Sequence, residues 1–117
     1  HRLWRGQSEF LLPIIENFRL NICQNLLEQY GKDWPLRWDR PDNDEEFEEI
    51  QKDPLAVSWG YLRHLLLSRK ELNNQRFYLP LVTACRSMRN HIAHHQTVKL
   101  TDYQYIQNEM DNLPSRL

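Results

Sequence analysis

Apolar residues recur every three or four positions along most of the chain, and this spacing places them on one face of an α-helix. The first predicted helix ends before Gly31, a residue typical of a helix C-terminal cap. Pro13 must lie near the start of this helix or kink it. The apolar stripe of this helix consists of Leu11, Ile15, Phe18, Ile22 and Leu26.

Three further helices are predicted in the second half of the chain. They cover about 58–67, a segment centred on 77–94 that starts near Asn74 or just before Pro80, and the segment after Thr101. In the last of these, Thr101 and Gln104 match a capping box, and Leu100 and Tyr105 match a hydrophobic staple. The inward positions are predicted to be Leu62, Leu65 and Leu66 in the first, Phe77, Leu81, Ala84, Cys85, Met88 and Ile92 in the second, and Ile106, Met110 and Leu113 in the third.

The segment between these helices predicts one long loop and one short helix. Residues 31–43 contain two tryptophans that we expect to pack onto the helices, and 44–51 form a short acidic helix. Leucine occurs 18 times, whereas Val, Ile and Thr together occur 12 times, which favours helix over sheet. The expected fold is therefore all-α, a bundle of four to five helices in a single domain over 1–117.

The length and the ends of the chain limit its class. Its 117 residues suffice for one domain, and because it begins with His1 rather than Met we expect a neighbouring domain in a longer protein. No apolar run reaches the ~18 residues of a membrane span, and no signal segment is present, so we expect a cytoplasmic protein without a membrane partner. Cys23 and Cys85 lie in helical stripes, which favours two reduced core thiols over a disulfide.

Charge is unevenly distributed, although the net charge is −1. Residues 42–53 carry seven acids against one lysine, whereas 60–100 carry seven basic residues against Glu71. The basic segment either attracts a polyanion such as RNA or is neutralised by the acidic segment in the fold. The weaker candidates for contacts with such a strand are Arg63, Arg69, Lys70 and Arg86.

The residues best suited to chemistry lie near the C-terminal end of the helix over 77–94. The apolar stripe passes through Met88 and Ile92, so Arg89, Asn90 and His94 point away from the core. Asn90 and His94 are neighbours at four residues' spacing, but Arg89 lies about 140° around the helix from His94. A distorted last turn or a second copy of the helix is needed to bring these two together.

Three interpretations of these residues stay open. Basic side chains at a helix end can simply cap its carbonyls, and composition alone favours this. His91 with His94 or His95 has the spacing of a zinc pair, but 76–100 contains no acid, and we expect neither a metal nor another cofactor. Phosphodiester cleavage is the third, since histidine moves protons near neutral pH, arginine binds phosphate, and RNA supplies its own 2'-hydroxyl nucleophile.

A family resemblance follows from the same residues. The run Arg-Asn-His-Ile-Ala-His at 89–94 resembles the Arg-polar-x-x-x-His signature of the HEPN superfamily, the higher eukaryote and prokaryote nucleotide-binding domains. The loop 96–100 and the helix that follows match the family's helix-loop-helix setting. Residues 30–34 and 53–55 are similar to a branch found with RNA-surveillance endonucleases and phage-defence proteins.

The resemblance implies a homodimer formed through the motif helices and a metal-independent ribonuclease. In this family pattern, Arg89 steadies the phosphate, His94 transfers protons and Asn90 positions them, while His91 and His95 flank the site as weaker substrate-binding candidates. A role as a toxin or phage-defence effector would fit. The alternatives are a non-catalytic HEPN-like module that dimerises or regulates a neighbouring domain, and nucleotide binding without cleavage.

Overall fold

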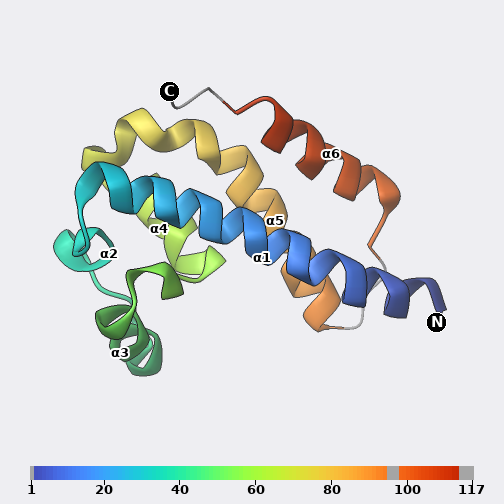
Figure 1. The fold of residues 1–117 in the computed structure, drawn as a ribbon, viewed down its shortest axis with the longest axis horizontal. Helices are drawn as coiled ribbons and strands as arrows, with labels where there is room; N and C mark the ends of the chain where they lie inside the picture. Colours follow the sequence, from blue (N-terminus) through green and yellow to red (C-terminus); the bar gives the residue numbers. More distant parts are fainter. Residues whose placement is uncertain (1, 95–97, 114–117) are drawn as a thin grey trace.

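The computed structural model describes residues 2–94 and 98–113, with side chains from residue 11 onward. All regular structure in these residues is helical (Figure 1), which confirms the all-α prediction. Five α-helices of nine or more residues are joined by turns, a single-turn helix and two 3₁₀ helices within the described part. In chain order the elements are α1 (Arg2–Tyr30), α2 (Trp34–Arg37), α3 (Asp44–Lys52), the 3₁₀ helix η1 (Pro54–Ala56), α4 (Trp59–Ser68), the 3₁₀ helix η2 (Lys70–Tyr78), α5 (Leu79–Ala93) and α6 (Leu100–Asp111).

Helix α5 is the centre of the bundle, since it packs against α1, α4 and α6. Figure 1 shows α1 crossing most of the length of the molecule, with α6 and α3 at opposite sides of it. Of the two predicted starts for the helix centred on 77–94, the one just before Pro80 is confirmed, because η2 ends at Tyr78 and α5 begins at Leu79. Proline is favoured there because backbone N–H groups in the first turn of a helix have no intrahelical partner, so the lack of an N–H in proline costs no hydrogen bond.

The predicted apolar stripes form the core. Burial follows the three- or four-residue spacing, as expected when helices are stabilised by packing of one apolar face. Cys23 and Cys85 are buried free thiols, as predicted. Burial raises the pKa of each to about 12, so both stay protonated in the native protein. The buried stripe residues include Leu11, Ile15, Ile22, Leu26, Leu62, Leu65, Leu66, Leu81, Met88, Ile92 and Ile106.

Helix α1 continues through Pro13, so the proline lies inside the helix rather than at its start. At the other end, the N–H of Gly31 bonds to the carbonyl of Leu27 at 2.9 Å, with a φ of 94°. This positive φ explains why glycine ends the helix, as predicted. Although α1 has 29 residues, none of the helices in the described residues combines the length and hydropathy of a membrane-spanning segment.

The expected loop over 31–43 contains the single turn of α2. Trp34 is fully buried, and Trp38 packs on the core with its ring 5.6 Å from that of Tyr30. The two tryptophans therefore pack onto the helices, as predicted. The acidic helix is also confirmed as α3, and the side chain of Asn43 caps it by accepting from the N–H of Glu46 at 3.0 Å.

The predicted start of the last helix is wrong. Helix α6 begins at Leu100, and its N-cap is Lys99, which forms no side-chain capping bond. The N–H groups of Asp102 and Tyr103 bond instead to the carbonyl of Lys99. Thr101 is thus already inside the helix and cannot form the capping box. The staple is also absent, since Leu100 and Tyr105 are 67% and 46% exposed; Val98 is the buried residue at this end.

Candidate functional site

Helix α5 carries three of the predicted site residues to one surface hollow. Its buried face is set by residues such as Met88 and Ile92, and this turns Arg86, Arg89 and Asn90 toward α1 and the start of α4. The hollow has a volume of about 390 Å³ and is called the arginine hollow below. Its lining residues are Glu16, Arg19, Ala56, Ser58, Trp59, Gly60, Arg86, Arg89 and Asn90.

Arg86 and Arg89 differ from the other arginines of the chain. The side chains of eight arginines are described, and six of them form hydrogen bonds or ion pairs. Within the described residues, Arg86 and Arg89 form neither. The two guanidinium groups thus lie one helical turn apart, and neither binds an anion or a carbonyl of the chain. The other six arginines bind groups of the folded chain.

Arg19 forms the opposite wall of the hollow and is fixed in place. Its Nη1 donates to the carbonyls of Leu55 and Val57, each at 2.6 Å, and its guanidinium pairs with Glu16. Burial alone would lower the pKa of Arg19, but the hydrogen bond and charge of Glu16 raise it overall. Arg19 therefore ties the η1 segment to α1 as a permanent cation. Sequence analysis missed this residue; its position beside the apolar stripe of α1 was the available signal.

The first turn of α4 closes the hollow. Ser58 is its N-cap, and the hydroxyl oxygen accepts from the N–H of Tyr61 at 3.2 Å. Gly60 follows in this turn, and a Cβ at this position would lie 3.6 Å from Nε of Arg86. The Arg86 side chain therefore lies directly against the helix start, where backbone N–H groups carry positive partial charge. The position of Gly60 in the lining of this hollow was also not predicted.

His94 lies outside the arginine hollow. It is the C-terminal cap of α5, its N–H bonds to the carbonyl of Asn90 at 3.0 Å, and its side chain is exposed. The structure therefore does not bring Arg89 and His94 together within one chain, in agreement with their angular separation on the helix. Both side chains are open to solvent and accessible to a second molecule. His95 lies outside the described residues.

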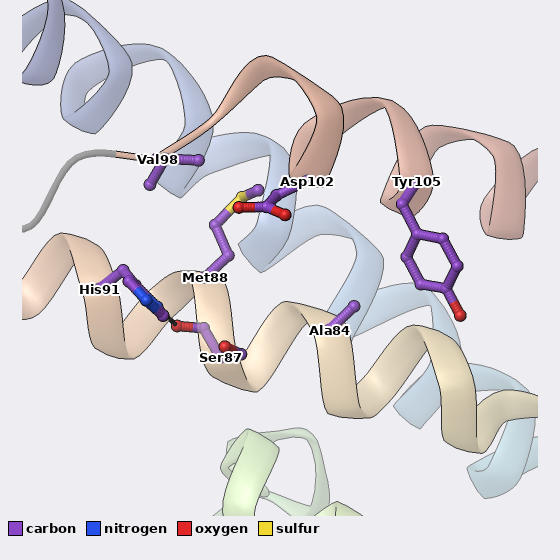
Figure 2. Close-up of a pocket in the computed structure, with 7 residues that line it drawn as sticks. All are labelled: Ala84, Ser87, Met88, His91, Val98, Asp102 and Tyr105. Carbon is purple, nitrogen blue, oxygen red and sulfur yellow. Dashed lines mark hydrogen bonds between the residues drawn. The ribbon is translucent and has the colours of Figure 1, made fainter.

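His91 occupies a different groove, between α5 and α6 (Figure 2). Its Nδ1 donates to the carbonyl of Ser87 at 2.7 Å, which leaves Nε2 as the basic nitrogen of the neutral ring. Figure 2 shows the side chains of Asp102 and Met88 between the two helices of this groove, whose volume is about 250 Å³. His91 is thus separated from Arg89 by the width of α5.

The other predicted basic residues lie away from the hollow. Arg63 donates to Thr83 at 3.1 Å, Arg69 donates to the carbonyl of Trp38 at 3.3 Å and pairs with Glu71, and Lys70 is exposed at the start of η2. Among the described residues, no ion pair joins the acidic segment 42–53 to the basic segment 60–100. The acidic segment therefore does not neutralise these residues by direct contact.

A metal centre finds no support in the described residues, since no three His, Cys, Asp or Glu side chains among them are grouped to hold an ion. Comparison with known proteins assigns no family either: no protein family, curated protein or solved structure matches the chain significantly. The resemblance to HEPN domains therefore rests on 89–94 and their setting at the end of α5.

Proposed function

We propose that this protein is a metal-independent endoribonuclease of the HEPN type, whose active site is shared by two copies of the chain. The observation that carries the proposal is that Arg89 is exposed and has no internal partner in the described residues. It lies on the helix that ends at the exposed His94. A guanidinium group held beside a surface hollow is suited to phosphate, and an exposed imidazole is suited to proton transfer.

The chemistry needs no group beyond the RNA and these side chains. The 2'-oxygen attacks the adjacent phosphorus while an imidazole removes its proton, and the bond from phosphorus to the 5'-oxygen breaks. A protonated imidazole gives its proton to the departing oxygen. The products are a 2',3'-cyclic phosphate and a 5'-hydroxyl end. Arg89 stabilises the charge on the phosphate, and Asn90 orients the substrate or the imidazole.

Two chains are required because of the geometry of α5. Arg89 and His94 project about 140° apart around the helix axis, too far to act on one phosphate from one chain. A two-fold axis near the ends of the two α5 helices would place His94 of one chain beside Arg89 of the other. The proposed active form is therefore a homodimer.

The experiment compares His94→Ala with His64→Ala in cleavage of a fluorescent RNA. His64 is a matched control, because it is exposed and bonds to Asp39 at 2.8 Å, outside the arginine hollow. We expect His94→Ala to lower kcat/KM at least about 100-fold, and His64→Ala to cleave like the parent. EDTA should have no effect, and circular dichroism should show unchanged helix. Undiminished cleavage by His94→Ala would refute the mechanism.

A non-catalytic dimerising module is the second candidate, and the exposed apolar side chains of α6 favour it. Leu100 and Tyr105 are both open to solvent on this helix. A protein that sediments as a dimer, leaves RNA intact and becomes monomeric on Leu100→Glu would have this function. Nucleotide binding without cleavage would appear as a thermal shift with ATP, since a ligand that binds only the folded state stabilises it.

A further inference from the structure

We propose that the arginine hollow holds a second phosphate of the RNA strand, one beside the phosphate that is cleaved. Arg86 is the residue that binds it, and the protein consequently selects strands with several phosphates over substrates with a single one. The selection among substrates rests on the proposed ribonuclease function. The binding of phosphate in the hollow does not depend on it.

The charges in the hollow favour an anion. Arg86 and Arg89 are three residues apart on α5, so their side chains are neighbours and their positive charges repel. Arg19 adds a third cation in the wall, and Glu16 is the one carboxylate among the lining residues. Glu16 is already paired with Arg19. A phosphate at Arg86, next to the one at Arg89, would offset this repulsion and form charge-assisted hydrogen bonds.

The acids on the other side of Arg86 form no ion pair with it. Arg86 also borders a second hollow, whose carboxylates are Asp39, Asp42 and Glu46. Asp39 bonds to Nε2 of His64 at 2.8 Å, and Glu46 accepts from the N–H of Ser58 at 3.1 Å. Asp42 is exposed, and none of the three carboxylates forms an ion pair with Arg86, whose guanidinium group is therefore available to a ligand.

The position of Arg86 along α5 determines which phosphate it can reach. Arg86 precedes Arg89 by three residues, about 4.5 Å along the helix axis, on the side away from the end of α5. A strand whose scissile phosphate lies at Arg89 would present a neighbouring phosphate to Arg86, beside the first turn of α4.

Binding is tested with a fluorescent 2'-O-methyl oligonucleotide, which cannot be cleaved because its nucleophile is blocked. Gly60→Glu places a carboxylate beside Arg86 at a helix start that favours acidic residues, so the fold should be kept. Gly60→Gln has the same size without the charge. Arg86→Gln removes the cation itself, and Lys32→Gln removes an exposed cation outside the hollow.

We expect Gly60→Glu and Arg86→Gln each to weaken binding at least about fivefold, and the slope of log K against log salt to fall by about 0.7 for the lost phosphate contact. Gly60→Gln should weaken binding less than Gly60→Glu, because it adds the same bulk without the charge, and Lys32→Gln should change the affinity less than twofold. Affinities of Gly60→Glu and Arg86→Gln within twofold of the parent would overturn the proposal.

Selection is tested by the ratio of kcat/KM for an oligonucleotide to kcat/KM for a dinucleoside monophosphate. We expect Arg86→Gln to lower this ratio about tenfold, because one charge-assisted hydrogen bond serves the longer substrate alone. An unchanged ratio, with cleavage intact, would refute the second phosphate position while the ribonuclease function stands. If the parent protein cleaves neither substrate, the ribonuclease proposal fails, and the binding experiment still decides whether the hollow holds phosphate.

Discussion

The basic residues of the second half of the chain fall into two regions with opposite uses. At the C-terminal end of α4, Arg76 donates to the carbonyls of Leu66 and Leu67 at 3.2 and 3.1 Å. Beside the start of the same helix, Arg86 and Arg89 of α5 have no internal partner in the described residues. Arg76 completes a helix whose last carbonyls would otherwise lack donors. Available hydrogen-bonding capacity, rather than charge, therefore distinguishes an arginine that can bind a ligand from a structural one.

The largest effects are expected from a matched pair of substitutions, one arginine in each of the two regions. Arg89→Gln should lower RNA cleavage by about 100-fold or more, because transition-state charge loses its donor. Its free energy of unfolding should stay within about 0.5 kcal/mol of the parent, as for an unpartnered surface residue.

Arg76→Gln should do the opposite. We expect it to lower the free energy of unfolding by about 1–3 kcal/mol, the cost of losing hydrogen bonds from a charged donor, and to cleave RNA like the parent. Urea denaturation and cleavage rates measure the two properties. Loss of stability in Arg89→Gln or loss of cleavage in folded Arg76→Gln would break the distinction between the two regions.

Arg19 sharpens the comparison, because it lines the arginine hollow yet has structural partners. Only 12% of its side chain is exposed, and it bonds to two carbonyls and to Glu16. Arg19→Gln should lower the free energy of unfolding by about 2–3 kcal/mol, since the carbonyls of Leu55 and Val57 lose a charged donor. Thermal or urea unfolding measures this. A variant as stable as the parent would show that these contacts do not hold η1 against α1.

The smallest effect is expected at Asp39, where a histidine rather than an arginine supplies the contact. The hydrogen bond from His64 lowers the pKa of Asp39, so the folded state favours the carboxylate. This stabilisation is fully present above the ordinary pKa of about 3.9. It is lost as pH falls through the lowered pKa of the folded state.

Acid unfolding followed by circular dichroism tests this contact. Asp39→Asn should reduce the part of the pH dependence that lies below about pH 4, and Asp42→Asn, at an exposed carboxyl, serves as the control. Identical acid-unfolding curves for the parent and Asp39→Asn would show that the contact contributes nothing to the folded state.

Much of the fold was predictable because its signals are local. The stripe from Leu11 to Leu26 and the stripe from Leu81 to Ile92 follow the helical period, and Gly31 ends α1 where its positive φ is needed. The start of α6 was not predictable from its capping residues. Burial of Val98 against the bundle fixes the position of the chain just before α6, and the helix begins before Thr101.

The sequence by itself determined that the chain is helical, which faces are apolar, and that Arg89, Asn90 and His94 share the end of one helix. Each of these follows from the spacing of residues close together in the chain. Only the tertiary structure decided which arginines are free. The carbonyls that bind Arg19 and the glycine beside Arg86 lie tens of residues away, at the η1 segment and on α4. The packing of the helices decides whether an arginine binds a backbone carbonyl or faces an open hollow. The local sequence pattern cannot predict this.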